Sequence, residues 1–99
     1  MPGEPIEYDI EFRWKEIVIY WEGDHGFSLA AGWGVDPGVT RVPSPALWDA
    51  VVPEWMRGRR EEIVGRLRAN RNHVVVDTDE GYTPQSAESN SVHRNPRWR

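Results

Sequence analysis

The chain has 99 residues, of which 38% are apolar and 28% charged, and its formal net charge is −4. Cysteine is absent, which excludes disulfides, thiolate metal sites and cysteine nucleophiles. The N-terminus lacks the basic head and apolar run of a signal peptide, and no apolar stretch reaches the roughly 18–20 residues of a membrane helix. We therefore expect a cytoplasmic protein with no membrane segment and, at this length, one domain with a modest core.

Residues 6–14 (IEYDIEFRW) alternate strictly, with apolar side chains at even positions and charged side chains at odd positions. A period of two predicts a strand with one buried face and one exposed face. The exposed face would carry an acidic ridge made of Glu7, Asp9 and Glu11. Such a ridge could dock a basic partner, or it could only protect the strand from edge pairing.

Residues 17–21 (IVIYW) are apolar on both faces, which predicts a strand covered on both sides. The two residues before it, Lys15 and Glu16, contain no glycine, asparagine or proline for a tight turn. We therefore expect a bulge in one long strand, with a short hairpin as the alternative. Glycines in residues 22–26 then predict a turn, and residues 27–34 predict the returning strand.

A helical region is predicted to start at Ser44 and Pro45, a capping serine followed by a proline suited to a first turn. Because Pro53 interrupts a helix, we expect one turn over 45–51 and a main helix from about 53 to 70. Its core stripe would contain Val52, Met56, Ile63 and Leu67, and Glu62 and Arg66 would pair across one turn. A last strand is expected near Val74–Val76.

These elements predict an α+β fold with the order β-β-β-α-β. In this fold a small antiparallel sheet of three to four strands carries one main helix on one face. Residues 1–82 would form this single domain. From residue 83 onwards the sequence loses its periodicity, so residues 83–99 are predicted to be a disordered polar tail.

The sequence offers little support for catalysis. The three histidines, at positions 25, 73 and 93, show no metal-ligand spacing, and no serine lies in a nucleophile elbow. The glycines around Trp33 match no phosphate-binding loop. We expect a protein that is not an enzyme and that needs no cofactor and no metal, although catalytic groups can converge from distant positions.

A protein partner is suggested by tryptophans and by the arginine-rich segment 55–62 (WMRGRREE). Tryptophan and arginine together are typical of interface hot spots, whereas buried tryptophans would only enlarge the core. The predicted partner-binding residues are Trp33, Trp55, Arg57, Arg59, Arg60, Glu7, Asp9 and Glu11. Nucleic-acid binding by the arginine-rich helix is the alternative, and the negative net charge of the chain disfavours it. The sequence does not decide whether the protein is a monomer or a homodimer.

Three stretches, IVIYWEG, AGWGV and VPSPALWDAVVPEWMRGRREEIVGRL, resemble a pattern in small bacterial proteins. Some similar proteins belong to immunity families of polymorphic toxin systems. The resemblance spans about residues 10–82 and brings no catalytic residues with it. It implies a small partner-binding protein, of the kind that occludes the active site of a toxin.

Overall fold

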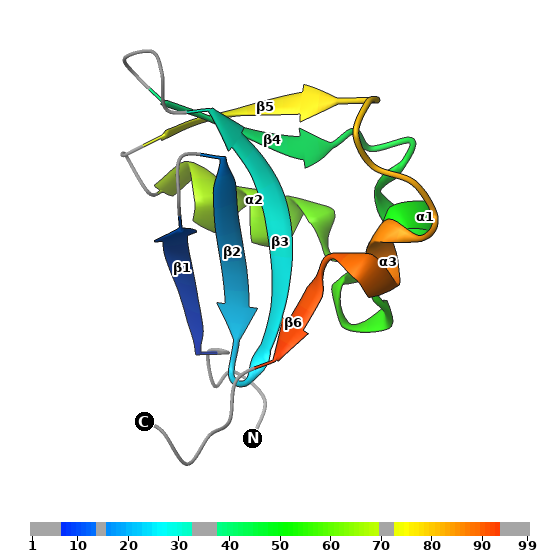
Figure 1. Cartoon of the computed structure of the whole chain (residues 1–99), viewed down its shortest axis with the longest axis horizontal. Helices are drawn as coiled ribbons and strands as arrows, with labels where there is room; N and C mark the ends of the chain where they lie inside the picture. Colours follow the sequence, from blue (N-terminus) through cyan, green and yellow to red (C-terminus); the bar gives the residue numbers. More distant parts are fainter. Residues whose placement is uncertain (1–6, 14–15, 33–37, 70–72, 94–99) are drawn as a thin grey trace.

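The computed structural model describes residues 7–13, 16–32, 38–69 and 73–93, and within them it shows a six-stranded, mostly antiparallel sheet with short helices (Figure 1). The strands are β1 (Tyr8–Arg13), β2 (Ile17–Glu22), β3 (His25–Gly32), β4 (Gly38–Pro43), β5 (His73–Thr78) and β6 (Ser91–His93). The helices are α1 (Trp48–Val51), the 3-10 helix η1 (Glu54–Met56), α2 (Arg60–Ala69) and α3 (Ser86–Ser89). The predicted sheet of three to four strands with one main helix was therefore wrong, although the α+β mixture is present.

The sheet runs in the order β1-β2-β3-β4-β5, and β6 also pairs with β3. Neighbours from β1 to β4 are antiparallel, but β4 and β5 are parallel. Parallel neighbours need a long crossover, which α1, η1 and α2 provide. Strand β4 was missed because its segment opens on turn residues and carries few large apolar side chains.

Strands β1 and β2 form a hairpin, because Arg13 pairs with Ile17 and Tyr8 pairs with Glu22. The predicted bulge was therefore wrong, and the alternative of a hairpin is confirmed; positions 14 and 15 lie outside the described residues. The bulge was inferred because Lys15 and Glu16 include no glycine, asparagine or proline for a tight turn. The register shows that β1 and β2 pair as a hairpin without such a residue at these two positions.

The predicted long helix is split by Gly58, whose φ of 72° lies in the left-handed region. A continuous helix cannot pass through that conformation, so the chain forms η1, turns, and starts α2 afresh at Arg60. The residues predicted for the core stripe are nevertheless all buried, and this part of the prediction is confirmed: Val52, Met56, Ile63 and Leu67.

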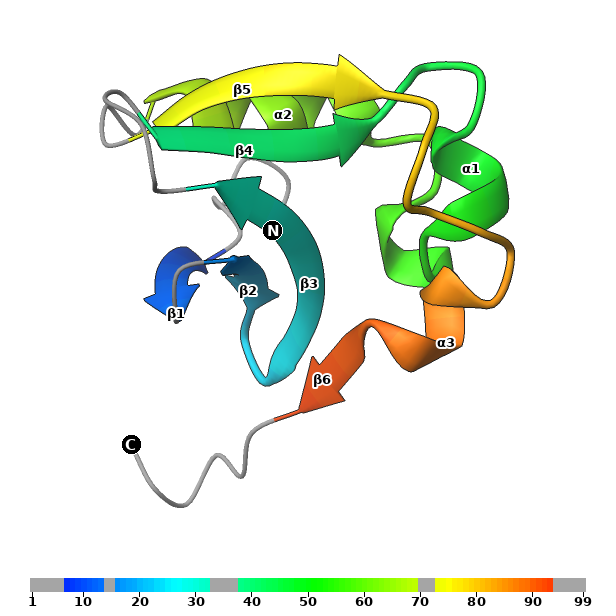
Figure 2. The same ribbon diagram turned by 45° about the horizontal axis from the view of Figure 1, so that its top comes forward.

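The segment predicted as a disordered tail contains α3 and β6 up to His93. Figure 2 shows that β3 curves, so that β6 lies beside its N-terminal end and β4 beside its C-terminal end. Three residues of β6 pair with β3 without any alternating apolar pattern, which is why composition pointed to disorder.

Tyr82 joins β3 to β4 near the point where β3 changes neighbours. The Ala30 N–H donates to the Tyr82 hydroxyl at 2.9 Å, and that hydroxyl donates to the Arg41 carbonyl at 2.7 Å. Burial raises the pKa of Tyr82 to about 12, so the hydroxyl keeps the proton that it donates. Tyr82 therefore supplies hydrogen bonds to two strands at once.

This geometry predicts a loss of stability in alkali. The pKa of Tyr82 is 10.0 in its unperturbed state and about 12 in the fold, so the unfolded chain releases the proton first. The contribution of Tyr82 to the stability should be complete below pH 10 and should fall by about 2–3 kcal/mol as the pH rises through 12. The Tyr82→Phe variant should lose about 1–3 kcal/mol at pH 7 and then decline less steeply above pH 10. Urea unfolding of the wild type and the variant from pH 7 to pH 11.5 measures the free energy of unfolding of each. An equal decrease of this free energy above pH 10 in the two proteins would contradict this role of Tyr82.

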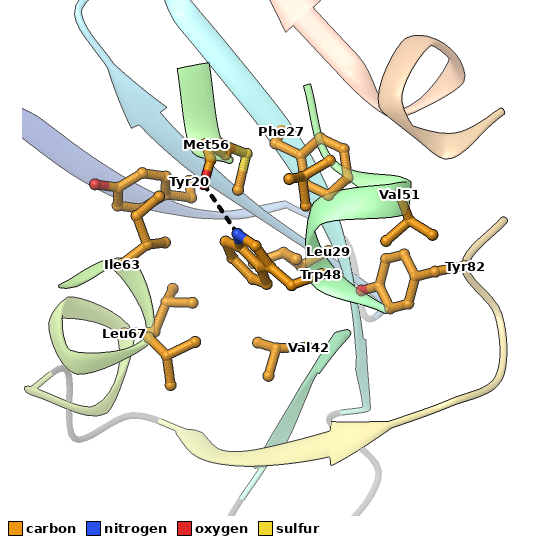
Figure 3. Packing of buried hydrophobic residues seen from close by; sticks show 12 residues of the cluster. Tyr20, Phe27, Leu29, Val42, Trp48, Val51, Met56, Ile63, Leu67 and Tyr82 are labelled. Carbon is orange, nitrogen blue, oxygen red and sulfur yellow. Dashed lines mark hydrogen bonds between the residues drawn. The ribbon is translucent and has the colours of Figure 1, made fainter. Parts of the chain in front are cut away.

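The main core lies between the sheet and the helices and is centred on Trp48 (Figure 3). Trp48 is 1% exposed, and its indole Nε1 donates to the Met56 carbonyl at 2.9 Å. Side chains from β2, β3, β4 and α2 surround it, among them Leu29 and Val42. This packing fixes η1, and with it the neighbouring Trp55, against the end of the sheet.

Candidate functional site

An aromatic row lies at the end of the sheet where β1 begins, β2 ends and β3 begins. The ring centroids of successive members lie 6.1, 6.2, 6.1 and 5.2 Å apart. In order, the members are Tyr8, Tyr20, Trp55, His25 and His93. We call this row the aromatic rim.

Most of the rim reaches the surface. Tyr20 is fully buried, but Tyr8 is 45% exposed and Trp55 is half-buried. His25 and His93 are both exposed. Trp55, His25 and His93 touch one another in turn at the surface, whereas Tyr8 is joined to Trp55 through the buried Tyr20 ring. Exposed aromatic rings offer a partner an apolar surface with polar edges.

Behind the rim, two carboxylates and two guanidinium groups form a cluster that we call the Glu22 network: Glu22, Arg59, Glu62 and Arg66. Arg59 donates from Nη1 and Nη2 to the two oxygens of Glu22, at 2.9 and 2.7 Å. Arg66 Nη1 lies 3.1 Å from Glu22, and its Nη2 lies 2.9 Å from Glu62. The predicted pair between Glu62 and Arg66 is confirmed.

The Glu22 carboxylate is the centre of this network, because its side chain is only 10% exposed. It also accepts a hydrogen bond from the Tyr20 hydroxyl. Burial, followed by that hydrogen bond, raises the pKa of Tyr20 far above its ordinary value, so Tyr20 stays neutral. The hydrogen bond to Glu22 likewise raises the pKa of Arg59, and the Arg59 hydrogen bond lowers the pKa of Glu62. Two acids and two arginines thus compensate one another.

The Glu22 network holds both ends of the apolar part of the rim. Arg59 Nη1 donates to the Trp55 carbonyl at 2.8 Å, which anchors η1. The Arg66 guanidinium lies over the Tyr8 ring, 4.8 Å from its centroid, a favourable cation–π arrangement. The rings are therefore fixed in position by the fold.

The predicted arginine patch does not form one surface. Arg59 belongs to the Glu22 network, whereas Arg60 donates to the Pro43 carbonyl at 3.1 Å and pairs with Asp77. Arg57 is exposed in the turn before α2. Trp55 joins Arg59 at the rim, and the predicted Trp33 lies outside the described residues.

The acidic ridge is separate from the rim as well. Asp9 and Glu11 project from the sheet face opposite Tyr8 and Tyr20, as the β1–β2 register shows. Glu11 accepts a hydrogen bond from Trp21 Nε1 at 2.8 Å, so its carboxylate satisfies the N–H of the buried indole. Glu7 and Asp9 are exposed.

Most of the rim, and the place of Glu22 at the centre of its network, were not predicted from the sequence. Tyr8 and Tyr20 were assigned to strands, but only the hairpin register shows that their rings meet. His93 was assigned to the tail. Hairpin pairing of β1 with β2 would have revealed the tyrosine pair, while nothing in the sequence pairs His25 with His93.

Two open pockets flank the network. One, of about 320 Å³, is lined by Tyr8, Asp9, Ile10, Arg66 and Ala69. The other, of about 540 Å³, is lined by Pro45, Trp48, Asp49, Gly58, Arg59, Arg60, Glu61 and Glu62. Within the described ranges, no group of three or more histidines or acids is arranged to hold a metal ion, and no helix is long and apolar enough to cross a membrane.

Comparison with known protein families, with curated protein sequences and with solved structures finds no match for this chain. The resemblance to immunity proteins therefore stays a prediction. The geometry of the aromatic rim is the remaining guide to function.

Proposed function

We propose that this protein is a non-catalytic binding module that recognises a partner protein through the aromatic rim. The observation that carries the proposal is the aromatic rim, in which Tyr8, 45% exposed, and Trp55, half-buried, each stack on the buried Tyr20 ring. Tyrosine and tryptophan are enriched in interface hot spots. Binding rings that are already held in place also loses less conformational entropy than ordering mobile ones.

A protein suits this surface better than a nucleic acid. The two arginines nearest the rim, Arg59 and Arg66, already bind Glu22 and Glu62, so little of their charge is available to phosphate. Nucleic-acid binders usually carry a broad basic surface, and this chain has a net charge of −4. The resemblance to immunity proteins makes a toxin domain the first partner to test.

The proposal predicts that truncating the rim abolishes partner binding. The tagged chain captures its partner from an extract of its source organism, and the partner is then purified and titrated by calorimetry. The Tyr8→Ala/Trp55→Ala double variant should bind at least about 30-fold more weakly, since a hot-spot residue contributes about 2 kcal/mol or more.

A matched control removes exposed apolar groups elsewhere. Val74 and Val76 are 46% and 36% exposed on β5, so the Val74→Ala/Val76→Ala variant should bind as the wild type does. Equal affinity of the rim variant and the wild type would contradict the proposal. Capture of nucleic acid, with absorbance at 260 nm and release at moderate salt, would contradict it too.

A further inference from the structure

Two histidines from distant parts of the chain lie side by side at the end of the aromatic rim. His25 and His93 are directly opposite each other on the antiparallel strands β3 and β6. Their ring centroids lie 5.2 Å apart with an interplanar angle of 75°. Both side chains are exposed, so a hydrated ion can reach them.

This spacing suits two imidazoles that share one metal ion. A zinc–nitrogen bond is about 2.0–2.1 Å long, and the ring adds about 1 Å from nitrogen to centroid. At a tetrahedral angle the two centroids are then about 5 Å apart, which agrees with the 5.2 Å between His25 and His93.

The surroundings favour a cation. The Asp24 Oδ1 lies 3.6 Å from His25 Nε2, which brings a negative charge beside the pair. The His25 ring also packs against the Trp55 ring, with centroids 6.1 Å apart. This contact restricts the orientation of the His25 imidazole. A nearby carboxylate and a restricted ring are the usual supports of metal-binding histidines.

We propose that His25 and His93 form a surface site for one divalent transition-metal ion of the zinc, nickel and copper class. These ions accept imidazole nitrogen, whereas magnesium prefers oxygen. Two protein ligands leave the other coordination positions to water. The bound ion would connect β6 to β3 and so stabilise the C-terminal strand. This site goes beyond the proposed partner binding and is measured on the isolated chain.

The test is a calorimetric titration with zinc chloride at neutral pH. The wild type should bind one ion, and His25→Ala and His93→Ala should each weaken binding at least about 10–100-fold, the loss expected even for an outer-shell partner. His73→Ala removes the third histidine and should leave binding unchanged. Binding should weaken as the pH falls, because protonated imidazole cannot ligate a metal, and magnesium chloride should not bind.

A second measurement avoids any folding defect of the variants. In the wild type, zinc should shift the ring resonances of His25 and His93 in the NMR spectrum and leave those of His73 in place. Zinc should also raise the melting temperature of the wild type, reversibly with a chelator. Binding that survives His93→Ala, or ring shifts confined to His73, would overturn the site, as would a wild type that binds no zinc.

Discussion

Replacing Trp48 with alanine is expected to destabilise the fold by about 3–5 kcal/mol, the range for a large aromatic side chain removed from a core. Trp48 is 1% exposed and lies at the centre of the cluster formed by the sheet and the helices (Figure 3). A small domain is stable by only about 5–15 kcal/mol. The melting temperature should therefore fall by roughly 15–30 °C, which thermal unfolding followed by circular dichroism measures.

The Trp48→Phe variant separates the ring from its hydrogen bond. Phenylalanine keeps most of the buried area but leaves the Met56 carbonyl, 2.9 Å from Trp48 Nε1, without this donor. The expected cost is about 1–3 kcal/mol. A loss below about 1 kcal/mol for Trp48→Ala would show that the side chain is not the centre of the core.

The second large effect is expected at Glu22. Glu22→Ala leaves Arg59 and Arg66, with side chains 23% and 19% exposed, facing each other without the carboxylate between them. Breaking a buried ion pair costs about 3–5 kcal/mol, and because these arginines keep some contact with water we expect about 2–4 kcal/mol. Urea unfolding at pH 7 gives the value. The Trp55 carbonyl accepts a hydrogen bond from Arg59, so the variant should also release Trp55 and weaken partner binding.

Glu62→Ala is the matched control, since Glu62 binds the same two arginines from a more exposed position. Its side chain is 41% exposed, and exposed ion pairs contribute about 0–1 kcal/mol. A loss for Glu62→Ala as large as that for Glu22→Ala would contradict the central position of Glu22.

The sequence predicted the features that depend on local pattern. The alternation of residues 6–14 predicted the strand β1, because a strand with one exposed face must alternate. The predicted division into a buried and an exposed face is not sharp, since Tyr8 is exposed and Glu11 is partly buried. The buried positions from Val52 to Leu67 were also predicted, since large apolar side chains leave water in nearly any backbone arrangement. Where the backbone itself bends was not predictable, because Gly58 could have stayed in a helix at a modest cost.

Long-range pairing accounts for the remaining errors. Strand β4 is held by its neighbours β3 and β5, and β6 by β3, although neither segment has a strong pattern of its own. The aromatic rim depends on three strand pairings at once, β1 with β2, β2 with β3 and β3 with β6, and on the position of η1. Trp55 and Arg59 were therefore predicted as candidates from the sequence, whereas the proximity of Tyr8, His25 and His93 to them was not.

The most direct test of the aromatic rim as a binding surface is NMR on the isotope-labelled chain while the purified partner is added. The proposal predicts that the indole N–H of Trp55 and the amides of β1, β2 and β3 nearest the rim shift first and saturate together. Shifts confined to the outer face of β4 and β5, around Val74 and Val76, would contradict it.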